Sequence, residues 1–168
     1  MRPATKKYDT RHKRKVDSDR DMYLPWLTPR GVIQCSGCGA FYSRRHWTLN
    51  PPGEFGTQAH VHPVYCPACR KIKDHYPGGE LRLAGFDTAE RREIARILRN
   101  EEDRAREKNP LERIMGIEAA DGGWKVETTT EKLAQRLGRA VRKARGGRIE
   151  FKWSHNNKFV RVLWDKGA

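Results

Sequence analysis

The four cysteines of the chain form two Cys-x-x-Cys pairs, Cys35 with Cys38 and Cys66 with Cys69, separated by residues 39–65. Two residues between cysteines let both sulfurs of a pair reach one metal ion from a tight turn. Two such turns supply the four ligands of a tetrahedral site. The spacing therefore predicts one closed four-thiolate metal site, with Zn²⁺ as the default ion.

Other uses of the cysteines fit the same spacing. Structural disulfides or a redox-active pair are disfavoured, because the first twenty residues lack the apolar stretch of a signal peptide. We therefore expect a cytoplasmic protein with reduced thiols. Iron in an electron carrier stays open as an alternative to zinc, since spacing alone does not identify the metal.

Positive charge is the second constraint on function. The 168 residues include 35 lysines and arginines against 21 acids, a formal net charge of +14. An excess of this size favours a polyanionic partner, and nucleic acid is the leading candidate. A membrane partner is not expected, because no run is long enough to span a bilayer and no segment is a clear basic amphipathic helix.

Composition and turn signals divide the chain into four parts, which together predict an α+β protein. Residues 1–25 read as a disordered basic arm, 26–80 as a zinc-binding module with all four cysteines, 81–109 as a charged helix, and 110–168 as a small basic α+β domain.

In the four-cysteine module, residues 32–34 lead into the first cysteine pair and residues 40–42 leave it, as in a short hairpin. Residues 70–76 read as a short helix after the second pair, ended by Pro77. This order is typical of a treble clef, and a zinc ribbon is the close alternative. The module is too short to close a hydrophobic core, so metal binding and folding should be coupled.

The charged helix is expected to begin at a capping box formed by Asp87 and Glu90 and to end before Asn109. Its first half carries an apolar stripe with Ile94 and Leu98, whereas its second half should be largely solvated.

The last part predicts the order ββαββ. Strands are expected over 111–119 and 124–128, joined by a Gly-Gly turn, with a helix beginning after Thr129 or Thr130. Two more alternating strands follow. One helix would then cover a four-stranded antiparallel sheet. The apolar positions expected in this core are Leu133, Leu137, Val141, Ile149, Phe151, Trp153, Val160, Val162 and Trp164.

Basic residues gather in the arm, in the four-cysteine module and on one face of the last helix. Eight cations between residues 132 and 152 face one acid, Glu150, and a nucleic-acid backbone would release counterions on contact with such a surface. The candidate nucleic-acid-binding residues are Lys13, Arg14, Lys15, Arg44, Arg45, Lys71, Lys73, Lys132, Arg136, Arg139, Arg142 and Lys143.

The paired cysteines occur in one order with Asn-Pro-Leu-Glu-Arg-Ile at 109–114, Asp-Gly-Gly-Trp-Lys-Val-Glu-Thr-Thr-Thr at 121–130 and Leu-Ala-Gln-Arg-Leu-Gly at 133–138. In these features, over about residues 35–164, the chain resembles a bacterial family of uncharacterised double-CxxC zinc proteins. That family more distantly resembles the N-terminal zinc-binding part of the large-ribosomal-subunit export adaptor family. The resemblance implies binding to ribosomal RNA or a ribosomal subunit. The adaptors have more than one four-cysteine site and later domains absent here, so a nuclear-export role does not carry over.

Catalysis is not expected, because four thiolates leave a zinc ion no open position and no nucleophile triad, P-loop or dinucleotide fingerprint is present. No small-molecule substrate is expected either. The predicted function is that of a zinc-containing, RNA-binding protein associated with the ribosome. A DNA-binding transcriptional regulator is the alternative, and an iron-thiolate electron carrier the third reading.

Overall fold

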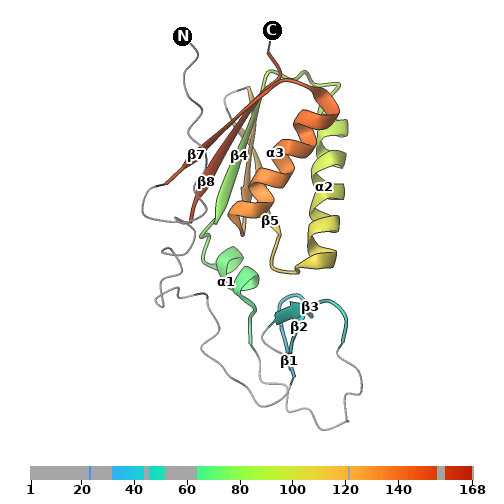
Figure 1. The fold of residues 1–168 in the computed structure, drawn as a ribbon, viewed down its shortest axis with the longest axis vertical. Helices are drawn as coiled ribbons and strands as arrows, with labels where there is room; N and C mark the ends of the chain where they lie inside the picture. The colour runs from blue at the N-terminus through green and yellow to red at the C-terminus, as the bar shows by residue number, and fades with distance from the viewer. Residues whose placement is uncertain are drawn as a thin grey trace, which may run out of the picture.

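The computed structural model describes residues 23, 32–43, 46–51, 64–120, 122–154 and 158–167. Within them the protein mixes helix and sheet, with a small sheet near the cysteines and a large sheet beside two long helices (Figure 1). The elements are β1 (Ile33–Gln34), β2 (Phe41–Ser43), β3 (His46–Thr48), α1 (Pro67–Lys73), β4 (Gly79–Ala84), α2 (Arg91–Lys108), β5 (Ile114–Ala120), β6 (Gly123–Thr128), α3 (Glu131–Arg145), β7 (Arg148–Trp153) and β8 (Val160–Asp165).

The large sheet has the order β5-β6-β4-β8-β7. Strand β4 runs parallel to β8, and the other neighbours are antiparallel. Helices α2 and α3 lie side by side on the same side of this sheet (Figure 1). The protein body, as we call α2, α3 and the large sheet together, is therefore a helix layer packed on one sheet face.

The expected four-stranded antiparallel ββαββ arrangement is wrong in one strand. The helix α3 and the four strands around it are present, but β4 inserts between β6 and β8 and makes the sheet five-stranded and mixed. The alternation of Glu80, Leu81, Arg82 and Leu83 is the strand signal, with both leucines buried. The central strand β4 thus spans the expected boundary at residues 80 and 81, and α2 begins only at Arg91.

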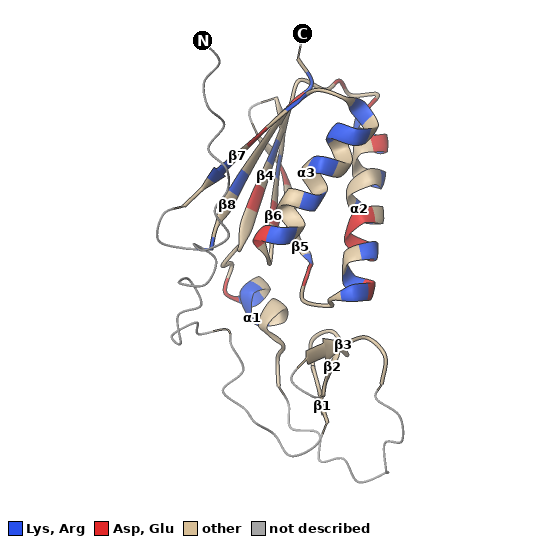
Figure 2. Ribbon diagram, in the orientation of Figure 1, with Lys and Arg blue, Asp and Glu red and all other residues tan. Residues whose placement is uncertain are grey.

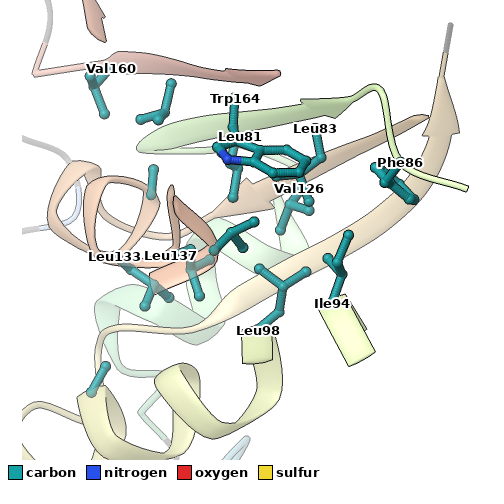
Figure 3. Close-up of a cluster of buried hydrophobic side chains, with 14 residues drawn as sticks. Leu81, Leu83, Phe86, Ile94, Leu98, Val126, Leu133, Leu137, Val160 and Trp164 are labelled. Atoms are coloured by element: carbon teal, nitrogen blue, oxygen red, sulfur yellow. The ribbon is translucent and has the colours of Figure 1, made fainter. Parts of the chain in front are cut away.

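One apolar cluster lies between the sheet and the two helices (Figure 3). Leu133, Leu137 and Val141 of α3 are fully buried, as their spacing predicted. Helix α2 adds Ile94 and Leu98, so its first half packs into the same cluster as α3 and the sheet. The second half has one buried residue among those described, an alanine at position 105.

Of the two tryptophans expected in this core, one is buried and the other is exposed. Trp164 is 1% exposed, and its indole Nε1 donates a 2.9 Å hydrogen bond to the carbonyl of Gly146 at the end of α3. Trp153 is 39% exposed, so its expected place in the core is wrong. It ends the edge strand β7, where the helix layer no longer covers the sheet.

The predicted capping residues form hydrogen bonds at both long helices, although α2 itself begins at Arg91. The backbone N–H of Asp87 donates to Glu90 Oε2 at 3.2 Å, and the N–H of Glu90 donates to Asp87 Oδ1 at 2.9 Å. This reciprocal pair is the expected capping box before α2. At the start of α3, Thr130 Oγ1 accepts from the N–H of Leu133 at 3.2 Å.

Candidate metal centre and basic surfaces

The structure brings all four cysteines together. The sulfurs of Cys35, Cys38, Cys66 and Cys69 lie within 4.8 Å of one another, and the Cys38 and Cys66 sulfurs are 3.7 Å apart. A tetrahedral site with metal–sulfur bonds of about 2.3 Å has sulfur–sulfur edges of about 3.8 Å. The cysteines are free thiols, since a disulfide would need sulfurs about 2.05 Å apart. The cluster therefore has the donor set and the size to hold a metal ion.

Each cysteine pair sits in a tight backbone turn. In the first, the N–H of Cys35 donates to the carbonyl of Ala40 at 2.7 Å, and the N–H of Gly39, at φ +74°, donates to the carbonyl of Cys35 at 2.9 Å. In the second, Cys66 is the N-cap of α1, and its sulfur accepts from the N–H of Cys69 at 3.4 Å. The second pair therefore lies at the start of a helix that contains Cys69, three residues earlier than the helix expected over 70–76.

Hydrogen-bond donors surround the sulfurs. Cys35 Sγ accepts from the N–H of Gly37 at 3.4 Å and from the N–H of Cys66 at 3.2 Å. Arg113 adds a guanidinium, with Nη1 3.3 Å from Cys69 Sγ. Such donors favour thiolates over thiols. Arg113 was not among the predicted site residues, because it lies 44 residues beyond Cys69 and cysteine spacing gives no signal for it.

The close approach and burial of the cysteines shift the pKa values of three thiols in different directions. A hydrogen bond from Cys66 lowers the pKa of Cys38 to about 4, and the same hydrogen bond raises the pKa of Cys66. Burial raises the pKa of Cys69 to about 11. Without a metal ion these shifts favour the thiolate of Cys38 and the protonated thiols of Cys66 and Cys69. A divalent cation among the sulfurs would stabilise all four as thiolates and release their protons.

The four-cysteine module, meaning β1–β3 and α1 with their cysteines, contacts one end of the body. Lys71 Nζ of α1 donates to the carbonyl of Thr129 at 3.1 Å. The Thr129 hydroxyl in turn donates to the carbonyl of Leu111 at 2.6 Å and accepts from the N–H of Arg113 at 2.8 Å. Leu111 also packs against the buried residues around the cysteines. The junction therefore joins the cysteine cluster directly to the residues that lead into β5.

Basic residues line α3, whereas α2 carries both signs of charge (Figure 2). The predicted residue Arg136 forms intramolecular ion pairs, with Glu101 of α2 at 2.9 Å and with Glu112 at 3.4 Å. The remaining predicted residues of this helix are exposed, and no acid among the described residues forms an ion pair with them. They are Lys132, Arg139, Arg142 and Lys143.

The predicted basic residues of the four-cysteine module and the arm are only partly described. The ammonium of Lys71 is committed to Thr129 and lies 5.4 Å from the Tyr23 ring centroid. Lys73 lies over the ring of Tyr65, at 5.6 Å, and that tyrosine is 46% exposed. The other five predicted residues lie outside the described residues: Lys13, Arg14, Lys15, Arg44 and Arg45.

A hollow of about 540 Å³ lies where α3 ends and β7 begins. Arg142, Arg148 and Lys166 line it, together with Asp165. Lys166 forms an ion pair with Glu90 at 2.7 Å. Among the described residues that line the hollow, the two arginines therefore supply the positive charge without an ion pair. Arg148 and Lys166 were not among the predicted site residues. Their only signal in the sequence is the density of basic residues around the Gly-Gly end of the helix.

The sheet face opposite the helices neutralises its own charges. Glu80 of β4 pairs with Arg82 at 2.6 Å and with Arg161 of β8 at 3.0 Å. Lys125 of β6 pairs with Glu118 at 3.0 Å and with Glu127 at 3.1 Å. This face offers a polyanion less free positive charge than the α3 side does.

No protein-family model, curated protein or solved structure matches this chain. The resemblance to the double-CxxC family accordingly stays a prediction. Among the described residues, no helix is both long enough and apolar enough to cross a membrane.

Proposed function

We propose that the cysteine cluster binds Zn²⁺ and that the module around it is a treble clef. Two features support this: the tetrahedral size of the sulfur cluster, and the start of α1 at the second cysteine pair. Cys35, Cys38, Cys66 and Cys69 would be the ligands. Bound zinc supplies folding energy here and no open coordination position, so the metal is structural and the protein is not an enzyme.

Metal content tests this assignment. Protein purified without added metal should contain about one zinc per chain by elemental analysis, and Co²⁺ substitution should give the intense visible bands of a tetrahedral thiolate site. An iron-thiolate electron carrier would instead be coloured as isolated and would change its spectrum on reduction.

We infer that the protein binds RNA and that its partner is ribosomal RNA or a ribosomal subunit. The main support for RNA binding is the set of exposed cations along α3 that form no ion pair with a described acid. On the sheet face opposite the helices, by contrast, many of the charged side chains pair with one another. Contact with a phosphate backbone would release counterions from this surface. The ribosomal partner rests on the resemblance to the double-CxxC family, and it implies a cytoplasmic protein.

The position of α3 favours RNA over duplex DNA. A recognition helix enters the major groove with an exposed face that stands out from the protein. Helix α3 instead lies in one layer with α2 and packs along the large sheet, so only a strip of its surface is accessible. A DNA-binding regulator is therefore the second candidate, and it makes the opposite prediction in the same experiment.

Cosedimentation provides the test. The zinc-loaded protein should migrate with ribosomal subunits in a sucrose gradient at low salt and be released at high salt. Labelled ribosomal RNA fragments should bind more tightly than duplex DNA of equal length at each salt concentration. Absence from all ribosomal fractions at low salt, or tighter binding of duplex DNA, would reject this function.

A further inference from the structure

The flank of α3 that faces β7 combines unpaired cations with aromatic rings. Arg139 places its guanidinium over the ring of Phe151, 5.2 Å from the centroid, and Trp153 lies two residues further along the strand. Arg142 and Arg148 line the hollow at the other end of this flank. We call these five residues the β7 strip.

Charge on the opposite flank of α3 is compensated. Toward α2, Arg136 pairs with Glu101 and Glu112, and Arg145 pairs with Glu90 and Glu93. In the β7 strip, no ion pair with an acid of the described residues engages the three arginines. Of the two flanks of α3, the one that faces β7 therefore carries the arginines without an ion pair among the described residues.

The aromatic rings add a property that plain electrostatic attraction lacks. The Trp153 indole is 39% exposed on an edge strand, and the Arg139 guanidinium lies over the Phe151 ring. An exposed indole and a stacked guanidinium are both platforms for nucleic-acid bases. Bases inside a duplex are already stacked on one another, so only unpaired bases can use such platforms.

We propose that the β7 strip binds single-stranded RNA, an inference that rests on the proposed RNA-binding function. Trp153 stacks on an unpaired base, and the stacked Arg139 extends the platform. Arg142 and Arg148 hold backbone phosphates at the hollow. The partner is thus an RNA loop, bulge or end rather than a continuous helix.

Two variants separate stacking from charge. Trp153→Ala should weaken binding of a labelled single-stranded RNA of mixed sequence about 5- to 150-fold, the range expected for loss of one stacked base. It should leave the salt dependence unchanged. The double variant R142S/R148S should reduce the slope of log affinity against log salt by about 0.7 for each phosphate that is no longer neutralised.

The matched control is R92S/R99S, which removes the same two charges from exposed positions of α2. It should retain a salt slope closer to wild type than R142S/R148S does. Trp153→Phe, which keeps an aromatic platform, should recover much of the affinity that Trp153→Ala loses. Thermal melts and metal content of each variant establish that it is folded.

Three outcomes would overturn the inference. Equal losses in R92S/R99S and R142S/R148S would mean diffuse electrostatic attraction with no localised site. Equal effects of Trp153→Ala on single-stranded and duplex RNA would remove the stacking role. Wild-type RNA affinity in all strip variants would place the RNA elsewhere, for example on α1 near Tyr65 and Lys73. If the wild type itself bound no RNA, the proposed function would fail before the strip was tested.

Discussion

The four-cysteine module and the body use different means to stay folded. Among the described residues, the buried cluster of the module contains six residues, of which three are cysteines, whereas the cluster of the body contains fourteen residues dominated by leucine, valine and isoleucine. Burial of aliphatic side chains stabilises the body directly. The cluster of the module is much smaller, and under the proposed zinc assignment the module depends on metal–sulfur bonds. The comparison teaches that, under the proposed assignment, a metal ion does in the module what the apolar core does in the body.

The largest effect should come from breaking the metal site. Cys66→Ser removes one ligand and the sulfur that caps α1, so stoichiometric zinc should be lost and β1–β3 should unfold. Elemental analysis gives the metal content, and far-UV circular dichroism should retain most of the signal of the body. Ser36→Ala, at an exposed non-ligand position between the first two cysteines, is the control. Unchanged zinc content in Cys66→Ser would refute the ligand assignment.

A core truncation in the body should have the converse result. Leu137 is fully buried between α3 and the sheet, so Leu137→Ala should lower the free energy of unfolding by about 2–5 kcal/mol. Zinc stoichiometry should stay unchanged. Urea denaturation measures the first quantity, with Leu49→Ala, at a position 39% exposed in the module, as the control. Loss of zinc from folded Leu137→Ala protein would show that the two regions depend on one another more than their separate cores suggest.

A smaller effect is expected at Gly138, where α3 packs closely against the sheet. A Cβ on Gly138 would lie 2.7 Å from Val162 Cγ1 and 2.9 Å from Ile149 Cδ1. Gly138→Ala should therefore destabilise the body by about 1–3 kcal/mol through overpacking, despite the better helix propensity of alanine. Gly116→Ala, where no atom lies within 4 Å of the new Cβ, is the matched control and should change little. Thermal unfolding of both variants distinguishes crowding from backbone effects.

The smallest effect concerns charge within the body. Hydrogen bonds from Lys166 and Arg145 lower the pKa of Glu90 to about 2. A lowered carboxyl pKa gives stability that is fully present above the ordinary pKa of about 4.5 and is lost as pH falls toward 2. Glu90→Gln should therefore be less stable than wild type at neutral pH, and this difference should shrink between pH 4.5 and 2. A difference that stayed constant with pH would assign the effect to packing.

Sequence patterns predicted the parts of this fold that have local signals. Cysteine spacing indicated that the four sulfurs come together, the leucine spacing of α3 indicated its buried face, and Asp87 with Glu90 indicated the capping box before α2. Strand β4 was missed because its short alternation lies between a glycine turn and a helix start, and its pairing with β8 spans about eighty residues of chain. The contact of Arg113 with Cys69 was missed for the same physical reason, since tertiary packing alone brings them together.

Charge was the least predictable feature. The basic face of α3 was visible in the sequence, but which cations remain unpaired depends on acids from distant elements, as the pairing of Arg136 with Glu101 and Glu112 shows. Exposure of Trp153 likewise depends on how far the helix layer extends over the sheet. The sequence therefore predicted a basic surface, and the tertiary structure determined which of its cations have no acidic partner.

Hydrogen exchange of the wild-type protein before and after zinc chelation tests the central claim most directly. We predict that chelation increases amide exchange in β1–β3, α1 and the junction at Leu111 and Arg113, while amides of α3 and the central strands β4 and β8 keep their protection. Unchanged exchange around the cysteines would contradict a metal-folded module, and loss of protection throughout the chain would contradict a body that is stabilised by its own core.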